Sequence, residues 1–273
     1  MKNSKKWLAS PYAIWAVGFV IIPLVMILYY ALTSQDTGGF TLANFAEAFS
    51  SQNLKALGLS LLLSFVSTVI CLVLAYPLAY ILSTRSVSQT SFIVLIFILP
   101  MWMNFLLRTL AWQTLLEKSG VINSILNFLH LPNINIINTP SAIILGMVYN
   151  FLPFMVLPIY NVMIKIDKDV IEAAHDLGAN GFQTFSKILI PLSLPGIVSG
   201  ITMVFIPALT TFVISDLLGG SKILLIGNVI EQEFKQTNNW NAGSALSTVL
   251  MIFILISMYF VNKYDKDGEG SVF

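Results

Sequence analysis

Charged side chains are scarce in this sequence. Asp, Glu, Lys and Arg make up 10% of its 273 residues, whereas a soluble domain carries about a quarter. Hydrophobic residues account for 56% of the chain, and the mean hydropathy is +0.83. These values exclude an ordinary water-soluble domain and indicate that lipid surrounds most of the chain. The net charge of +1 offers no basic surface, so no nucleic-acid partner is expected.

Cysteine and histidine are also nearly absent. The single cysteine, Cys71, has apolar neighbours and no intrachain disulfide partner, so a packed thiol is expected. The two histidines, His130 and His175, are far apart in sequence, which disfavours a histidine-based metal site. No G-x-x-x-x-G-K-[ST] motif occurs, and no nucleophile stands out beside a base. We therefore predict a chain that is not an enzyme and binds no metal or cofactor itself.

Long apolar runs dominate the sequence. A helix needs about 20 apolar residues to cross a bilayer, and six runs are long enough: 11–33, 56–83, 91–116, 140–164, 191–217 and 241–262. The first is too long for a signal-peptide core and lacks a small-residue cleavage site, so it should remain as an anchor. The predicted fold is an all-α membrane protein, a single domain over residues 1–273 with six transmembrane helices.

The basic residues predict the orientation in the membrane. Most Lys and Arg residues outside the runs gather at the two termini and in the connections after the second and fourth runs. The positive-inside rule then places both termini and the loop at 165–190 in the cytoplasm. Arg108 lies inside the third run, near its outer end, where we expect an ion pair with Glu117 or Asp216. The predicted outer side carries a small excess of carboxylates over lysines, and this weakly favours a cationic cargo.

Prolines and small residues interrupt several runs. Pro100 predicts a bend in the third run, and further prolines in the fourth and fifth runs fit helices that line a cavity. Gly196 and Gly200 allow close helix packing, within this subunit or, less favoured, between subunits. The segment 121–129 has helical apolar spacing but is too short to span, so we expect an interfacial helix on the outer face, ended by Pro132.

The loop at 167–190 is the one sizeable polar connection between apolar runs. Asp169 fits an N-cap with Glu172 three residues later, and Gly178 and Gly181 are suited to end the helix. An apolar stripe opposes a polar edge made by Glu172 and Asp176; the stripe consists of Val170, Ala173, Ala174 and Leu177. Such a helix either lies on lipid or docks onto a protein. The acidic edge is unsuited to anionic lipid, and the alanines suit close approach to a protein.

The spacing within this loop resembles the signature of permease subunits of type I ATP-binding-cassette (ABC) importers. That signature reads Glu-Ala-Ala, three residues, Gly, nine residues, Ile-x-Leu-Pro; here it starts at Glu172, with Ile190 in place of the usual Leu. The resemblance implies a coupling helix that sits in a groove of the ATPase. By this match, contact with the ATPase falls to Glu172, Ala173, Ala174 and Gly178, to which we add the intervening Asp176 and Leu177.

Other segments are similar to the permeases of spermidine/putrescine importers. They are Leu99-Pro100 with Arg108-Thr109, residues 152–158, and residues 215–220 with 225–230. The resemblance implies polyamine cargo, a bacterial plasma-membrane location and a second, PotC-like permease. It also implies a PotA-like ATPase dimer that uses ATP and Mg²⁺, and an extracytoplasmic PotD-like binding protein. Rival hypotheses are the same architecture carrying another solute, or a proton-coupled transporter. The second is weakened because acids are absent from the middle of the runs.

A polyamine needs carboxylates for its ammonium groups and aromatic faces for its methylenes. Asp216, near the outer end of the fifth run, is the best candidate; the alternative is a structural ion pair with Arg108 or Lys222. Glu117 is a weaker candidate because Lys118 adjoins it. Glu231 and Glu233 could meet cargo or a binding protein.

Aromatic and amide residues within the runs complete the set of cargo candidates. Trp102 and Tyr149 could form aromatic walls, whereas Trp112 and Tyr160 fit membrane-interface anchors better. Asn104 and Asn150 are polar groups inside apolar runs. Each either bonds a neighbouring helix or lines a cavity.

Overall fold

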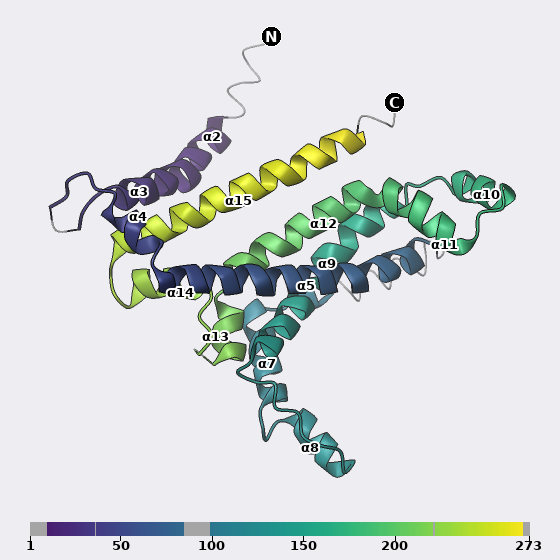
Figure 1. Ribbon diagram of the computed structural model, residues 1–273, viewed down its shortest axis with the longest axis horizontal. Coiled ribbons are helices and arrows are strands. Elements are labelled where there is room, and N and C mark those ends of the chain that lie inside the picture. The colour runs from purple at the N-terminus through teal and green to yellow at the C-terminus, as the bar shows by residue number, and fades with distance from the viewer. Residues whose placement is uncertain (1–9, 36, 85–98, 221, 270–273) are drawn as a thin grey trace, which may run out of the picture. The chain divides into compact units, whose positions relative to one another are not determined.

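The computed structural model describes residues 10–35, 37–84, 99–220 and 222–269, and it is built from helices (Figure 1). The chain divides into two compact units. Unit 1 comprises Met1–Ala56 and Val229–Leu255, and unit 2 comprises Leu57–Asn228 and Ile256–Phe273.

Five helices within the described residues are long and apolar enough to span a membrane. They cover Pro11–Ala31, Ser51–Ser83, Pro140–Met163, Gly181–Thr210 and Trp240–Tyr259. They match five of the six predicted runs in place. The other predicted run, 91–116, begins outside the described residues.

Unit 1 is organised around the end of the first span. The helices α2 (Ser10–Ala16), η1 (Val17–Ile21) and α3 (Ile22–Ala31) follow one another without a break. The Asn44 amide of α4 (Ala43–Ala48) donates to Ala31 O and Thr33 O at 3.0 and 2.8 Å. The Asn241 amide, at the start of α15 (Trp240–Glu269), donates to Thr33 O at 2.6 Å. These bonds satisfy carbonyls that the end of α3 leaves without helical partners.

Unit 2 has its core where α5 (Ser51–Ser83, from residue 57), α9 (Pro140–Met163) and α12 (Ile190–Thr210) meet (Figure 1). Cys71, Met147, Met155 and Ile159 are fully buried there. A Cβ added at Gly196 would lie 2.9 Å from Pro158 O, and one at Gly200 would lie 2.7 Å from Met155 Sδ. The two glycines therefore allow α12 to approach α9 closely. The prediction that they serve packing within the subunit is confirmed.

The third predicted run is interrupted. Within its described part the helix stops at Trp102, and α7 (Phe105–Leu116) begins anew with Asn104 as its N-cap. Asn104 Oδ1 accepts from the backbone N–H groups of Leu106 and Leu107 at 2.8 and 3.3 Å. The side chain stabilises a new helix start, so the described part of the run is broken at Asn104. A bend at Pro100 depends on residues before Leu99, which lie outside the described residues.

The fifth predicted run, 191–217, is wrong as a single helix. The helix α12 ends at Thr210, Thr211 is extended, and α13 (Val213–Gly219) follows. The chain returns close to this break, because a Cβ at Gly227 would lie 2.7 Å from Thr210 O. The Asn228 amide also donates to Phe212 O at 3.1 Å. The backbone carbonyl of Phe212 at the break thus has a hydrogen-bond partner outside the helix, and this permits the interruption.

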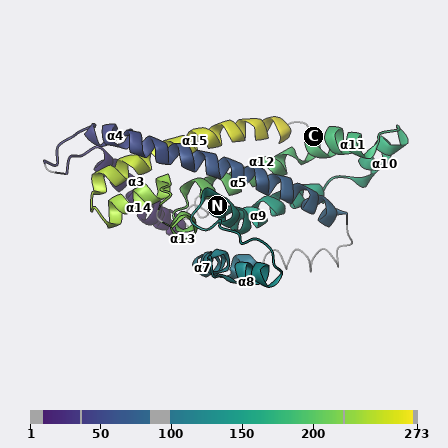
Figure 2. The same cartoon turned by 60° about the horizontal axis from the view of Figure 1, so that its bottom comes forward.

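A short amphipathic helix, α8 (Val121–Phe128), follows α7, as expected for the segment 121–129. It ends before His130, which has a φ of +56°, and thus earlier than Pro132. Its Asn123 is buried and exchanges hydrogen bonds with the backbone of Ile134 at 2.8 and 2.9 Å. Its apolar side chains at Val121, Ile125 and Phe128 are exposed. Figure 2 shows α7 and α8 together on one side of α9, and α7 packs against α9 through Trp112 and Tyr149.

Candidate functional site: a coupling loop and a broken helix end

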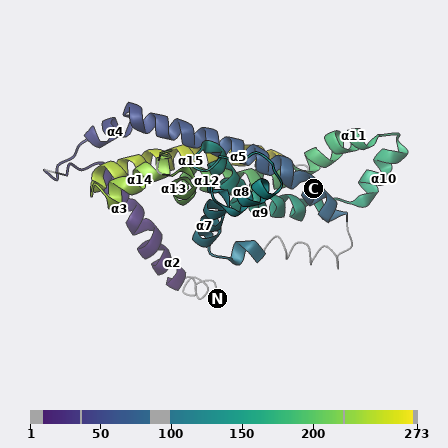
Figure 3. The same ribbon diagram turned by 90° about the horizontal axis from the view of Figure 1, so that it is seen from below.

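The loop between the fourth and fifth spans is folded into short helices at one end of unit 2 (Figure 3). They are α10 (Lys168–Asp176), α11 (Gly181–Thr184) and the π-helix η2 (Phe185–Leu189), which runs into α12. The predicted N-cap was wrong by two residues. Asp167 caps α10 by accepting from the backbone N–H of Asp169 at 3.1 Å. Asp169 lies instead in the first turn, where its charge suits the helix dipole.

The two glycines of the loop have different roles. Gly178 has a φ of +82°, a conformation that glycine adopts without a steric cost, and it turns the chain after α10 as predicted. Gly181 does not end a helix. It begins α11, which is fixed by a capping box in which Asn180 and Gln183 exchange hydrogen bonds of 2.9 Å.

Large apolar side chains stay exposed on this loop. Of the predicted stripe, Ala174 is buried, whereas Val170 and Leu177 are 45% and 89% exposed, and Phe182 nearby is 77% exposed. We call Val170, Leu177 and Phe182 the coupling-loop patch. Glu172 and Asp176 are also exposed, as expected for a polar edge. An exposed apolar patch rimmed by polar groups is typical of a contact surface.

A cavity of about 460 Å³ lies in unit 1. A second cavity, of about 310 Å³, lies beside the coupling loop in unit 2. Its lining includes Tyr80 and Thr84 at the end of α5, Ile166 after α9, and Ile171 and Glu172 of α10. Ile171 and Glu172 of α10 therefore face open space beside the ends of two spans. A helix seated over such space can shift with little repacking.

The loop is linked to the core through Tyr76 of α5. Its ring contacts Phe185 of η2 edge to face, with centroids 5.3 Å apart. Its hydroxyl lies 2.9 Å from Ser193 Oγ in α12, and Ser193 also donates to Leu189 O at 2.6 Å. A π-helix within an α-helix often marks a functional position. A movement of the loop is thus connected to both α12 and α5.

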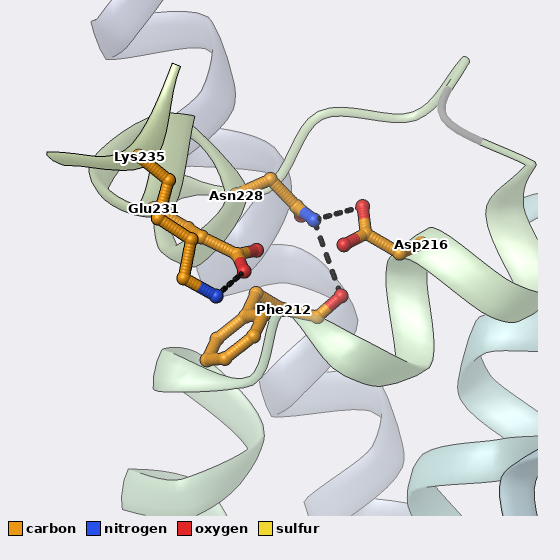
Figure 4. A network of polar contacts seen from close by, with 5 residues as sticks. All are labelled: Phe212, Asp216, Asn228, Glu231 and Lys235. Atoms are coloured by element: carbon orange, nitrogen blue, oxygen red, sulfur yellow. Dashed lines mark hydrogen bonds and ion pairs between the residues drawn. The ribbon is translucent and has the colours of Figure 1, made fainter. Parts of the chain in front are cut away.

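At the far end of α12, Asn228 organises the break before α13 (Figure 4). Its amide nitrogen donates to Asp216 Oδ1 at 2.6 Å and to Phe212 O at 3.1 Å. Its oxygen accepts from Ser215 Oγ at 2.5 Å and from the Leu225 N–H at 3.1 Å. Asn228 is 1% exposed, whereas Asp216 is half-buried. The buried amide therefore holds one oxygen of the candidate carboxylate in place.

The surroundings of Asp216 differ from the expectation. It lies in the first turn of α13, where a carboxylate is favourable, and not in the last turn of a continuous fifth span. Asn228 was missed as a site residue, although it lies in the segment 225–230 that carried the resemblance. In unit 1, Glu231 forms an ion pair with Lys235 at 2.7 Å (Figure 4).

Arg108 forms neither of the ion pairs expected for it. It is 7% exposed, and its Nε and Nη1 have no hydrogen-bond partner among the described residues. The expected pair with Glu117 or Asp216 is therefore wrong. Glu117 is exposed at the end of α7, where its backbone carbonyl accepts from Asn123 at 3.1 Å.

The remaining candidates do not form one contact network. Trp102 is 78% exposed, and Asn104 serves as the cap of α7. The Asn150 amide donates within α9 to Gly146 O at 2.9 Å, while its Oδ1 has no partner in the described part of the chain. Tyr149 packs edge to face against Trp112, with centroids 5.2 Å apart, and so joins α9 to α7. These contacts are structural, and none of them identifies a cargo site.

Apolar spans with interrupted ends, joined by a folded polar loop with an exposed apolar patch, define a membrane-embedded transport subunit. The model of the family described as binding-protein-dependent transport system inner membrane component matches residues 6–265. The chain therefore belongs to this family of inner-membrane transport components.

Its relatives sharpen this assignment. The spermidine/putrescine transport system permease protein PotB of Haemophilus influenzae is 38% identical over 260 residues, covering 91% of each chain. PotB of Escherichia coli strain K12 is 40% identical over 245 residues, covering 87% of this chain and 89% of the relative. A chain from the crystal structure of a bacterial ABC transporter that imports alginate superposes with a TM-score of 0.81 at 20% identity, covering 97% of each chain. That likeness supports the type I importer permease fold.

Proposed function

We propose that this chain is the permease subunit of an ABC importer and forms half of the translocation path for the polyamines spermidine and putrescine. The observation that carries the proposal is the identity of 38–40% to PotB permeases over most of the chain. The carboxylate at Asp216 supports it chemically. A half-buried carboxylate oriented by an amide can accept an ammonium group in a charge-assisted hydrogen bond.

The coupling-loop patch is the proposed docking surface for the ATPase. Its exposed side chains at Leu177 and Phe182 need a partner surface, and the acidic edge of α10 favours protein over anionic lipid. We infer a PotA-like ATPase dimer that binds ATP and Mg²⁺, so that this chain holds no cofactor. This arrangement requires the loop and both termini to be cytoplasmic, in keeping with the distribution of lysines.

Two further partners complete the proposed assembly. A second, PotC-like permease would supply the other half of the path, and a PotD-like binding protein would deliver cargo from outside. A solved structure of similar fold supports the general scheme, since it holds a bacterial alginate ABC transporter in complex with a periplasmic protein that binds an alginate pentasaccharide. The exposed surface of the first span is available to lipid or to the second permease.

The proposed mechanism passes movement along α12. Closure of the ATPases on ATP would push on the coupling-loop patch, and the cavity behind α10 leaves room for that shift. The link from Phe185 through Tyr76 to Ser193 would carry the movement into α5 and α12. The interruption at Thr211 would let α13 and Asp216 change position relative to α12. Such coupling requires elements with two arrangements, which hydrolysis then biases.

Uptake of labelled spermidine by membrane vesicles that contain the complete transporter tests this function. Unlabelled spermidine and putrescine should compete, whereas anionic solutes should not. Asp216→Asn should reduce the apparent affinity by about 10- to 150-fold, since hydrogen bonds to charged groups contribute about 1.5–3 kcal/mol. The control Glu47→Gln neutralises an exposed carboxylate of α4 that belongs to no candidate site, and it should change little.

Two results would support the rival functions. Equal competition by an anionic solute would favour an ABC permease for another cargo. Uptake driven by a proton gradient without ATP would favour a secondary transporter.

A further inference from the structure

We propose that unit 1 contains a binding pocket for a primary ammonium group at the membrane boundary. The pocket lies where the first span ends in α3 and the last span begins in α15. Its volume is about 460 Å³, within the range of small-molecule sites. Its residues belong to unit 1 alone, so the pocket does not depend on the cargo path or the coupling loop.

Aromatic rings form one side of this pocket. Tyr29 and Tyr30 have ring centroids 5.7 Å apart, and Tyr30 lies 6.1 Å from Trp240. Trp240 is held on its other side by Phe234, with centroids 5.4 Å apart. All three of Tyr29, Tyr30 and Trp240 line the pocket. Aromatic faces attract ammonium groups by about 0.5–2 kcal/mol each.

The remaining lining is rich in oxygen and carries no charge. No Lys, Arg, Asp or Glu is among the described lining residues. Gln35 and Asn238 line the pocket, and their side chains form no hydrogen bond with the described residues, so their amide oxygens are available. The carbonyls at the end of α3 already accept from the Asn44 and Asn241 amides, so the Gln35 and Asn238 oxygens are the acceptors offered to a ligand. Acceptors and ring faces together suit an ammonium group.

The position of the pocket indicates how such a ligand would arrive. Met26 and Tyr29 line it and also lie on the exposed surface of the first span. A lipid in the surrounding bilayer could therefore place its headgroup there, and phosphatidylethanolamine carries a primary ammonium. A free polyamine presents the same group from the aqueous side. The shared chemistry defines the site, and the experiment separates the two sources.

Native mass spectrometry of the purified complete transporter tests the proposal, with phosphatidylethanolamine, phosphatidylglycerol and spermidine as probes. Wild type should retain phosphatidylethanolamine in preference to phosphatidylglycerol. Trp240→Leu should weaken that retention by about 2- to 30-fold, the equivalent of one lost cation–π contact. Tyr12→Leu is the matched control, since Tyr12 is an exposed ring on the first span outside the pocket. Displacement of the lipid by spermidine would show that free amines share the site.

A variant that is expected to bind more tightly separates loss of the site from misfolding, since a misfolded protein would bind less. Asn238→Asp keeps the side-chain size, and Asp tolerates the φ of +53°. A carboxylate there should tighten binding of phosphatidylethanolamine by about 5-fold or more. The proposal is overturned if wild type retains both lipids equally, or if Trp240→Leu and Asn238→Asp both bind phosphatidylethanolamine and spermidine as wild type does.

Discussion

The turn after α10 is a sensitive point of the coupling loop, because Gly178 adopts a φ of +82°. A Cβ at this position would meet no atom within 4 Å, so the cost of Gly178→Ala comes from the backbone alone. The left-handed conformation costs a residue with a Cβ about 1–2 kcal/mol. That free energy lowers the fraction of loops with the native turn by about 5- to 30-fold relative to altered turns. Binding of the ATPase and ATP-driven uptake should fall by up to the same factor.

Gly181→Ala is the matched control. A Cβ there also meets no atom within 4 Å, and the residue has no positive φ. Gly178→Asn should be milder than Gly178→Ala, because Asn tolerates this backbone region. The assay is the amount of ATPase that co-purifies with tagged permease from equal quantities of membrane, together with uptake by the same membranes. The reasoning is refuted if the two alanine variants behave alike.

Three further changes probe the fold of unit 2. Gly196→Ala should cost about 1–3 kcal/mol of stability and so lower the thermal midpoint of the detergent-solubilised protein, because its Cβ would meet the backbone of Pro158 and Ile159 at 2.9 and 3.0 Å. Gly18→Ala, where the space is open, should leave the midpoint unchanged. Equal midpoints for the two variants would contradict the close packing at Gly196. Asn228→Leu should reduce the yield of folded protein in size-exclusion chromatography, since each buried polar group left without a partner costs about 1–3 kcal/mol; an unchanged yield would show that the network at the break is dispensable. Cys71 is fully buried and should react with a maleimide only after denaturation, so rapid labelling of the native protein would argue against this core.

The spans were predictable because lipid demands long apolar helices. The fourth run, 140–164, agrees with α9 at Pro140–Met163 to within one residue. The break in the fifth run was not predictable from composition. It depends on Asn228, which bonds Phe212 from sixteen residues away, and periodicity carries no information on such a contact. Asn104 was similarly ambiguous, since an amide in an apolar run can also turn back to cap its own helix.

The coupling loop was predictable in outline and less so in detail. The spacing from Glu172 to Gly178 located the helix and its turn, because a left-handed end strongly favours glycine. The N-cap was misplaced because Asp167 and Asp169 both have suitable side chains two residues apart. Burial along the stripe was not evident either, since Ala174 alone packs inward. The cargo candidates were the least predictable part of the site, because tertiary contacts decide whether a polar side chain already has a hydrogen-bond partner.

The central claim is that ATP hydrolysis by a separate subunit drives solute through this chain by way of residues 167–190. Proteoliposomes that contain the complete transporter, with ATP on the side of that loop, test it most directly. Spermidine should accumulate only with ATP and the ATPase present, and Glu172→Lys should abolish accumulation while the permease stays in the membrane. Accumulation without the ATPase, or normal uptake by Glu172→Lys, would contradict it.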